Sequence, residues 1–168
     1  VSGGLQGVVR SISKLAKGRR STQLITVLTG LMIFIDDYAN TMIVGSTMRP
    51  VTDHKKISRE KLAFLVDATT APVAGVAFIS TWIGFELWLF SNVAESTGIT
   101  RDSYSMFLDT LQFRFYCLMM ILFVLLNVLT GRDFAAMLRA EMRAANTGKL
   151  LEDDAVPMTS QVLSTLSH

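Results

Sequence analysis

The sequence has few of the residues from which metal centres, disulfide frameworks and nucleophilic catalysts are built. It contains one cysteine and two histidines among 168 residues. Cys117 lies inside an apolar run and has no second cysteine in the chain to pair with, so it indicates no redox compartment. Neither His54 nor His168 has a nucleophile or a set of metal ligands near it in the sequence, and neither a phosphate loop nor a nucleophile elbow is found. We therefore expect no enzymatic activity and no resident cofactor.

Residues 1–22 lack acidic residues and lack the layout of a signal peptide. Apolar residues recur there at near-helical spacing beside five basic residues: Arg10, Lys14, Lys17, Arg19 and Arg20. This pattern predicts a cytoplasmic, basic amphipathic segment on an anionic membrane surface. A nucleic-acid patch is the competing use of such a cluster, but the apolar run that follows directly favours a membrane flank, and we expect no nucleic-acid partner. Because the chain starts at Val1 and not at a methionine, we expect a piece of a longer protein.

What the sequence has in abundance is apolar residues, which make up 50% of the chain. Both ends are polar, so the apolar residues are concentrated in the middle, as in an integral membrane protein. The alternative is a soluble domain in which residues 24–44 form a buried helix capped by an acidic pair. Two further apolar stretches later in the chain disfavour that alternative. We predict an all-α integral membrane fold.

Residues 23–48 are apolar at both ends and polar in the middle, at residues 36–41 (Asp-Asp-Tyr-Ala-Asn-Thr). An ionised carboxylate at bilayer depth costs about 2.5–3.5 kcal/mol even on the lenient insertion scale, so such a residue usually faces a cavity or a pathway. The apolar stretch before Asp36 gives only roughly 20 Å of helix, against about 30 Å of hydrocarbon. The polar residues are good turn and cap formers. A single crossing helix and a re-entrant helical hairpin with these residues at its tip are both compatible with this pattern.

The distribution of basic residues decides between the two geometries. The cytoplasmic loop expected at 49–61 holds five basic residues, the external loop expected at 93–107 holds only Arg101, and residues 131–168 hold four. If residues 23–48 return as a hairpin, fourteen basic residues lie on the cytoplasmic side and one lies outside. If they cross, the split is nine against six. The positive-inside rule therefore favours the re-entrant hairpin.

Residues 62–92 are predicted to form a broken transmembrane helix. Ser58 is placed to cap it, Glu60 lies in its first turn, and Leu62, Leu65, Val66 and Thr69 would share one face. Pro72 removes a backbone donor and disfavours helical geometry at Ala71, so we place the break at residues 69–72. The alternative is an interfacial helix followed by an ordinary span.

Residues 108–130 are predicted to form one further transmembrane helix, followed by an amphipathic cytoplasmic helix and linker at 131–168. Arg114 would lie about two turns into this span, where its long side chain could snorkel or pair with Asp109. Glu86 lies near the same end of the membrane as Trp88 and could reach water.

Oxygen atoms of carboxylates, hydroxyls, amides and freed backbone carbonyls bind hard cations. The hairpin tip offers Asp36, Asp37, Asn40 and Thr41, and the predicted break offers Asp67, Thr69 and Thr70. Two broken elements that meet near the bilayer midplane are a transporter arrangement. Because two adjacent carboxylates in a low-dielectric site do not both ionise, we expect them to hold a shared proton until a cation displaces it.

Two stretches resemble the NhaC-type Na⁺/H⁺ antiporter family: residues 35–86 (IDDYANTMIVGSTMRPVTDHKKISREKLAFLVDATTAPVAGVAFISTWIGFE) and residues 131–144 (GRDFAAMLRAEMRA). The resemblance covers roughly residues 23–146. It implies a multi-pass antiporter of the cytoplasmic (inner) membrane that belongs to the ion-transporter clan. Such a protein is built from two inverted repeats that each contain a re-entrant hairpin and a broken helix. This chain would be half of such a transporter, with the second repeat absent. The family's acidic motif falls on Asp36 and Asp37, and its broken segment falls on residues 67–72.

Three functions remain open at this stage. The first is exchange of Na⁺ for H⁺, both of them cargo. The second is exchange of an organic acid or amino acid on the same architecture, with Arg49 or the hairpin backbone binding its carboxylate. The third is a non-transporting membrane assembly subunit, in which Asp36 and Asp37 pair with cations on a partner. The expected partners are the lipid bilayer and the rest of the transporter, with a homodimer as an open alternative.

Overall fold

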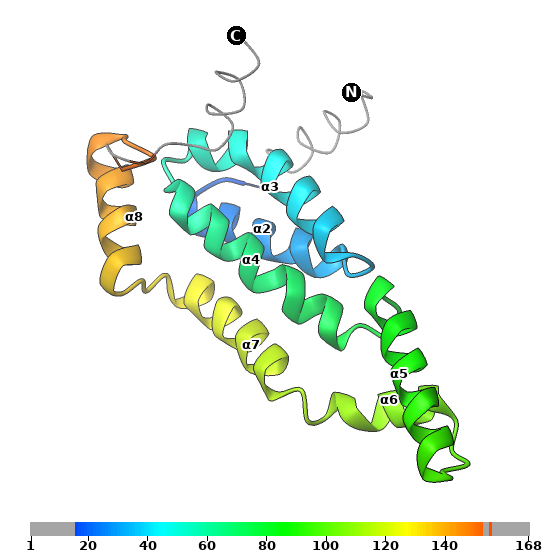
Figure 1. Ribbon diagram of the computed structural model, residues 1–168. Helices are drawn as coiled ribbons and strands as arrows, with labels where there is room; N and C mark the ends of the chain where they lie inside the picture. Colours follow the sequence, from blue (N-terminus) through cyan, green and yellow to red (C-terminus); the bar gives the residue numbers. More distant parts are fainter. Residues whose placement is uncertain (1–15, 153–154, 156–168) are drawn as a thin grey trace, which may run out of the picture.

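The computed structural model describes residues 16–152 and 155, and within them every regular element is a helix, as the predicted all-α class requires. Residues 1–15 of the predicted N-terminal amphipathic segment lie outside the described residues, and so does the end of the C-terminal linker. Figure 1 shows the described helices in chain order: α2 (Arg19–Met32), α3 (Asp37–His54), α4 (Arg59–Val76), α5 (Thr81–Thr97), α6 (Ser103–Leu111), α7 (Phe115–Thr130) and α8 (Ala135–Thr147).

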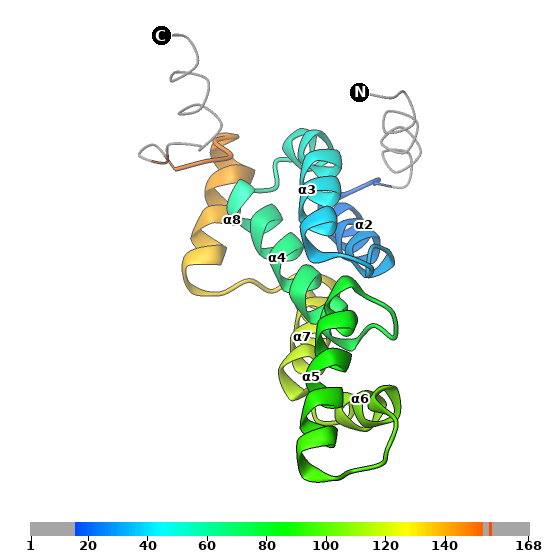
Figure 2. The same cartoon turned by 45° about the vertical axis from the view of Figure 1, so that its right-hand side comes forward.

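Helices α2 and α3 form a helical hairpin, with residues 33–36 as its turn (Figures 1 and 2). The turn lies just before most of the predicted tip at residues 36–41, because residues 37–41 already belong to α3. Re-entry of this hairpin into a membrane stays a prediction. Asp36 caps α3 by accepting a hydrogen bond from the backbone N–H of Ala39 at 2.8 Å. The Asn40 side chain closes the turn from the other side, because its Nδ2 donates to the carbonyl oxygens of Gly30 and Ile33, both at 2.8 Å. The hairpin is longer than predicted, since α3 runs to His54 and the loop before α4 is short.

Helices α4 and α5 form a broken helix, bent by 42° at residues 77–80. The existence of a break is as predicted, but its predicted position at residues 69–72 is wrong, because α4 continues through Pro72 to Val76. Pro72 lacks one intrahelical hydrogen bond and crowds the carbonyl one turn before it, but this part of α4 is buried on both sides of the proline, and tertiary packing keeps it helical. The break lies in a stretch without proline or glycine, Ala-Phe-Ile-Ser.

The predicted single span at 108–130 is also wrong in detail, because residues 112–114 separate α6 from α7. Arg114 does not pair with Asp109. Its guanidinium instead contacts Glu86 on α5 and the Gly75 carbonyl on α4, while Asp109 pairs with Arg101 at 2.7 Å. Glu86 therefore has a basic partner within the protein.

Helix α4 lies at the centre of the fold, and its two buried faces join two hydrophobic clusters. The first packs α3 against α4, and the second packs α2 and α7 against α4. Ser58 caps α4 by accepting from the Lys61 N–H at 3.1 Å, and the predicted buried face of α4 is confirmed. The clusters consist of Ala16, Val44, Met48, Val51, Leu62 and Val66, and of Val27, Leu65, Ala68, Val124 and Val128.

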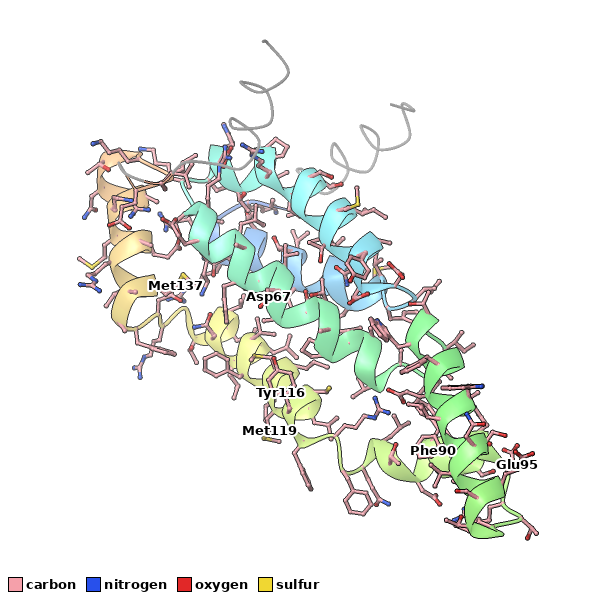
Figure 3. The ribbon with its side chains drawn as sticks, in the orientation of Figure 1. Asp67, Phe90, Glu95, Tyr116, Met119 and Met137 are labelled. Carbon is pink, nitrogen blue, oxygen red and sulfur yellow. The ribbon has the colours of Figure 1, made fainter. Side chains whose placement is uncertain are left out.

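Much of the apolar surface remains exposed, above all on α7. In the described part of the chain, the stretch from α7 through α8 is long and apolar enough to cross a membrane, and the bent pair of α4 and α5 passes the same test when taken together. Tyr116 and Met119, labelled in Figure 3, are 66% and 57% exposed on α7. A helix that shows this much apolar surface needs lipid or further protein around it.

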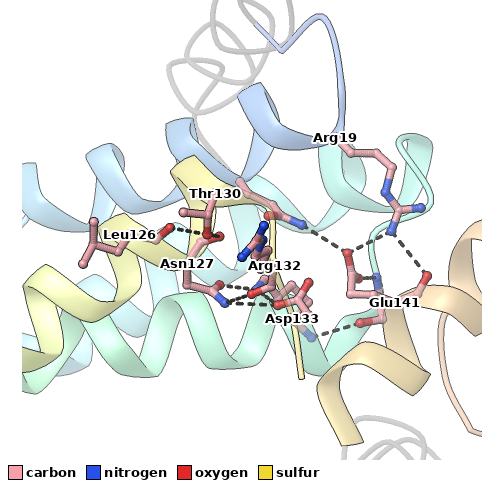
Figure 4. Close-up of polar contacts among 10 residues, drawn as sticks. Arg19, Leu126, Asn127, Thr130, Arg132, Asp133 and Glu141 are labelled. Atoms are coloured by element: carbon pink, nitrogen blue, oxygen red, sulfur yellow. Dashed lines mark hydrogen bonds and ion pairs between the residues drawn. The ribbon is translucent and has the colours of Figure 1, made fainter. Parts of the chain in front are cut away.

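A polar cluster ties α8 to the ends of α2, α4 and α7 (Figure 4). The buried carboxylate of Glu141 accepts from Arg19 at 2.8 Å, from Gln23 at 3.1 Å and from the backbone N–H of Ser58 at 2.8 Å. Beside it Lys61, only 1% exposed, donates to Asn127 and forms an ion pair with Asp133. Buried charges of this kind are tolerated because each has an opposite charge and hydrogen bonds.

Replacement of Lys61 by Met leaves the mostly buried Asp133 without its cation, so we expect the free energy of unfolding to fall by about 3–5 kcal/mol. Thermal unfolding of the detergent-purified full-length protein measures this loss. Arg139→Met, on the exposed side of α8, is the matched control and should change stability by less than about 0.5 kcal/mol. The double variant Lys61→Met/Asp133→Leu should recover most of the loss. Equal unfolding temperatures for Lys61→Met and Arg139→Met would contradict the assigned ion pair.

Candidate cation site at two helix breaks

The turn of the hairpin lies against the break between α4 and α5. The backbone N–H of Thr81, at the start of α5, donates to the carbonyl oxygen of Ile35 in the hairpin turn at 2.9 Å. In Figure 2 the turn between α2 and α3 and the start of α5 come together near the middle of the molecule. The interruption between α2 and α3 is therefore in contact with the interruption between α4 and α5.

The acidic residues of the hairpin tip are held by side chains of α5. Asp36, besides capping α3, accepts a hydrogen bond from the Thr81 hydroxyl at 3.0 Å through its second oxygen. Asp37 accepts from the Trp82 indole N–H at 3.2 Å and from the backbone N–H of Tyr38 at 3.0 Å. Each carboxylate thus has donors of its own. The shared proton expected from the sequence stays a prediction.

The helix ends supply the positive potential that favours these carboxylates. Asp36 is the N-cap of α3, Asp37 is its first helical residue, and both contact the first residues of α5. The N-terminus of a helix carries about half a positive charge, and here two N-termini face the same pair of acids. Negative charge is stabilised at this tip even though the sequence places no basic residue beside it.

Two buried oxygen atoms near the tip have no hydrogen-bond partner. One is Oδ1 of Asn40, whose Nδ2 closes the hairpin, and the other is the hydroxyl of Ser80, which occupies the N-cap position of α5 without capping the helix. A buried polar atom without a partner costs free energy, so such atoms commonly mark a functional contact. Amide and hydroxyl oxygens are also ligands that Na⁺ accepts, as a hard cation.

Of the remaining predicted site residues, Thr41 lies one helical turn after Asp37 on α3, and the other three lie on α4. Thr41 is exposed on α3, and its hydroxyl donates to the Asp37 carbonyl at 3.0 Å. Asp67, labelled in Figure 3, is exposed about midway along α4 and shares with Thr41 a groove of about 570 Å³ between α3 and α4. Thr69 and Thr70 are buried, and their hydroxyls donate to carbonyls of their own helix. The structure therefore joins Asp36, Asp37 and Asn40 at the tip and places Thr41 one turn further along α3, whereas Asp67, Thr69 and Thr70 lie on α4.

The sequence analysis missed the α5 side of the site, namely Ser80, Thr81 and Trp82. A signal was present, because Ser-Thr directly before an apolar helical pattern is typical of a helix start. Because Pro72 is the stronger sequence signal, the break was predicted at residues 69–72 and not at residues 77–80, where it lies. Among the described residues, no three His, Cys, Asp or Glu side chains cluster as a metal site, so a cation bound here would rest on the two aspartates and on neutral oxygens.

Residues 73–167, more than half of the chain, match the Na⁺/H⁺ antiporter family. The chain belongs to this family. It is also 32% identical over 156 residues to an uncharacterized protein of Haemophilus influenzae, an alignment that covers 92% of this chain and 30% of that protein. The chain thus spans about a third of the length of its relative. No solved structure matches it.

Membership of an antiporter family makes the chain part of a membrane protein and associates it with cation and proton transport. The matched residues begin within α4 and include α5, so they contain the half of the tip contact contributed by Thr81 and Trp82. The acidic hairpin lies before the match, but nearly the whole chain aligns with the Haemophilus protein.

The position of the hairpin on α4 depends on a close approach between Gly30 and Thr69. A Cβ atom at Gly30 would lie 2.3 Å from the Thr69 hydroxyl oxygen. We expect Gly30→Ala to lower the free energy of unfolding by about 1–3 kcal/mol, because neither helix has room to yield. Thermal unfolding in detergent measures the change. Gly45→Ala is the control, because nothing lies within 4 Å of its added Cβ. Equal or greater stability of Gly30→Ala would show that the hairpin is packed differently.

Proposed function

We propose that the full-length protein exchanges Na⁺ for H⁺ across the cytoplasmic membrane as a multi-pass antiporter of the NhaC type, and that the hairpin tip with the start of α5 forms the chain's part of its cation site. The observation that carries the proposal is the contact of Asp36 and Asp37 with Thr81 and Trp82. Family membership supports the class of transport. The residues of this contact support the location of the site.

The cation would take oxygen ligands from groups that already converge on the tip. Both aspartates offer carboxylate oxygens, and Asn40 Oδ1 and Ser80 Oγ are the buried oxygens without a partner. The donors on Thr81 and Trp82 would hold the carboxylates while no cation is bound. When Na⁺ enters, it replaces these donors in stabilising the negative charge of the carboxylates. The Thr81 hydroxyl can then turn its oxygen toward the ion.

Exchange follows from competition for the same oxygens. A carboxylate that binds a proton loses the charge that attracts Na⁺, and a carboxylate that binds Na⁺ resists protonation. If the site opens to one side at a time, either ion can leave only when the other replaces it. A shared proton on the aspartate pair remains part of this proposal.

We propose that the hairpin re-enters and that the ends joined by α8 face the cytoplasm. Contacts between basic segments support this orientation: Arg19 pairs with Glu141, Arg143 pairs with Glu60 at 2.6 Å, and the Arg59 N–H donates to the Leu150 carbonyl at 3.0 Å. The described parts of the three basic segments counted on the cytoplasmic side are therefore in contact with one another. Glu95, labelled at the far end of α5 in Figure 3, belongs to the opposite end. The positive-inside rule then assigns the end that carries the basic segments to the cytoplasmic side of the membrane.

One observation favours a second substrate class. Two helix N-termini face the tip, and N-termini also bind the carboxylate of an organic acid or amino acid. Arg49 does not strengthen this alternative, because it lies twelve residues after Asp37 along α3, roughly 18 Å of helix away. Uptake of labelled organic acids in the same vesicles distinguishes the two substrate classes.

Removal of either tip carboxylate is expected to impair Na⁺ transport. We expect Asp36→Asn and Asp37→Asn each to raise the half-saturating Na⁺ concentration by about tenfold or more, because each loses a charged ligand worth about 1.5–3 kcal/mol. In the unchanged protein, the half-saturating Na⁺ concentration should rise as pH falls, because protons compete for the carboxylates. The measurement is Na⁺-driven dequenching of a pH dye in everted vesicles between about pH 6.5 and 9, a range set around the working pH of such exchange.

Asp109→Asn is the control for both variants, because Asp109 is exposed and its partner Arg101 lies on the loop before α6. It should keep the transport of the unchanged protein. Full activity with an unmoved pH profile in both tip variants would overturn the proposed site. Na⁺-independent exchange of an organic acid would overturn the proposed substrate and keep the architecture.

The proposed topology is tested by thiol labelling. Single cysteines replace Lys56, in the turn between α3 and α4, and Ser96, near the end of α5, in a full-length protein without other cysteines. An impermeant reagent applied to intact cells should label position 96 and not position 56, because basic loops stay in the cytoplasm. In everted vesicles the pattern should invert. Labelling of position 56 from outside would mean that residues 23–48 cross the membrane.

A further inference from the structure

Arg114 occupies the break between α6 and α7 and reaches to both sides of the other break, the one between α4 and α5. Its Nη1 donates to the carbonyl oxygen of Gly75, in the last turn of α4, at 2.7 Å. The same nitrogen lies 3.1 Å from Oε1 of Glu86, in the second turn of α5, and Nη2 forms an ion pair with the other oxygen of that carboxylate. One guanidinium thus holds the end of one helix and the beginning of the next.

The surroundings of Arg114 fix its position. The guanidinium lies over the ring of Phe107 on α6, 5.1 Å from the ring centroid, and both it and Glu86 are mostly shielded from solvent. Helix α7 approaches α4 closely at the same level, because a Cβ at Gly75 would lie 2.9 Å from Sγ of Cys117. The contact therefore joins α4, α5, α6 and α7 at one point.

We propose that Arg114 is a positioning residue that sets the bend between α4 and α5 and thereby holds Thr81 and Trp82 against the acidic hairpin tip. Its functional consequence rests on the proposed cation site, whereas its structural consequence does not. Arg114 touches neither aspartate. It acts by fixing α5, whose first residues do.

The geometry requires an arginine and not only a positive charge. The planar guanidinium of an arginine carries several N–H donors. It can therefore contact a carbonyl oxygen at the end of one helix and both carboxylate oxygens on another at the same time. A lysine has one ammonium group on a flexible chain and pairs with the carboxylate as a point charge. We therefore expect Arg114→Lys to keep the pairing with Glu86 but to loosen the bend.

The structural test is a disulfide cross-link between the hairpin tip and α5. Cysteines replace Ile35 and Thr81, whose backbones are joined by a hydrogen bond of 2.9 Å, in the full-length protein carrying Cys117→Ser and no other cysteine. Oxidation in membranes should form this cross-link readily. Arg114→Gln and Glu86→Gln should each slow its formation several-fold, and Arg114→Lys should give an intermediate rate. Arg101→Gln, which breaks the exposed pair with Asp109, is the matched control and should leave the rate unchanged.

The functional test uses the same substitutions without the cysteine pair, in everted vesicles. Arg114→Gln should raise the half-saturating Na⁺ concentration several-fold at equal protein level, because only the fraction of molecules with α5 in place can bind. Unchanged cross-linking in both Arg114→Gln and Glu86→Gln would overturn the positioning role. Slower cross-linking with unchanged Na⁺ transport would support the positioning role and count against the cation site instead. If Arg114→Gln does not accumulate in membranes, Glu86→Gln and Arg114→Lys carry the same comparison.

Discussion

The constraint on which this structure depends is the need of every backbone group at an interrupted helix to find a partner. In water such groups bond to solvent, but inside a membrane they must bond to protein. Here side chains and a second interrupted helix satisfy them. The Asn40 side chain donates to carbonyls at the end of α2, and the Asp36 carboxylate accepts from a free N–H at the start of α3. The Ile35 carbonyl accepts from the Thr81 N–H. Because each break supplies partners for the other, neither forms in the same way alone.

The same constraint places the charges. The aspartates of the hairpin tip lie at helix N-termini, and Arg114 donates to a carbonyl at the C-terminal end of α4, so at these two ends each sign lies where the helix dipole favours it. At the ends joined by α8, the buried Glu141 likewise accepts from the Ser58 N–H at the start of α4, and Lys61 pairs with Asp133. Polar residues within this apolar chain thus serve either to end helices or to lock the ends of helices together.

The sequence predicted those features that depend on local chemistry. Asp36 and Asn40 predicted the hairpin turn, and Ser58 predicted the start of α4, because caps act over three or four residues. It did not predict the break at 77–80, which depends on distant contacts such as the Tyr104 hydroxyl on the Phe78 carbonyl. It paired Arg114 with Asp109, its neighbour along the chain, although the partner lies on another helix. The aspartates of the site were predictable from the sequence. Their partners Thr81 and Trp82 were not, because only the folded structure brings α5 to the hairpin tip.

Arg114 at the break at 112–114 donates to the Gly75 carbonyl just before the break at 77–80, and α5 and α6 between the two breaks pack chiefly on each other. Helices α2, α3, α4 and α7 share the two hydrophobic clusters around α4. The chain is therefore built as a large block and a small arm, joined at two breaks that Arg114 bridges. Any rotation of the arm at these breaks would have to break the Arg114 contacts and would carry Thr81 and Trp82 away from the hairpin tip, while the tip stays in place on the block.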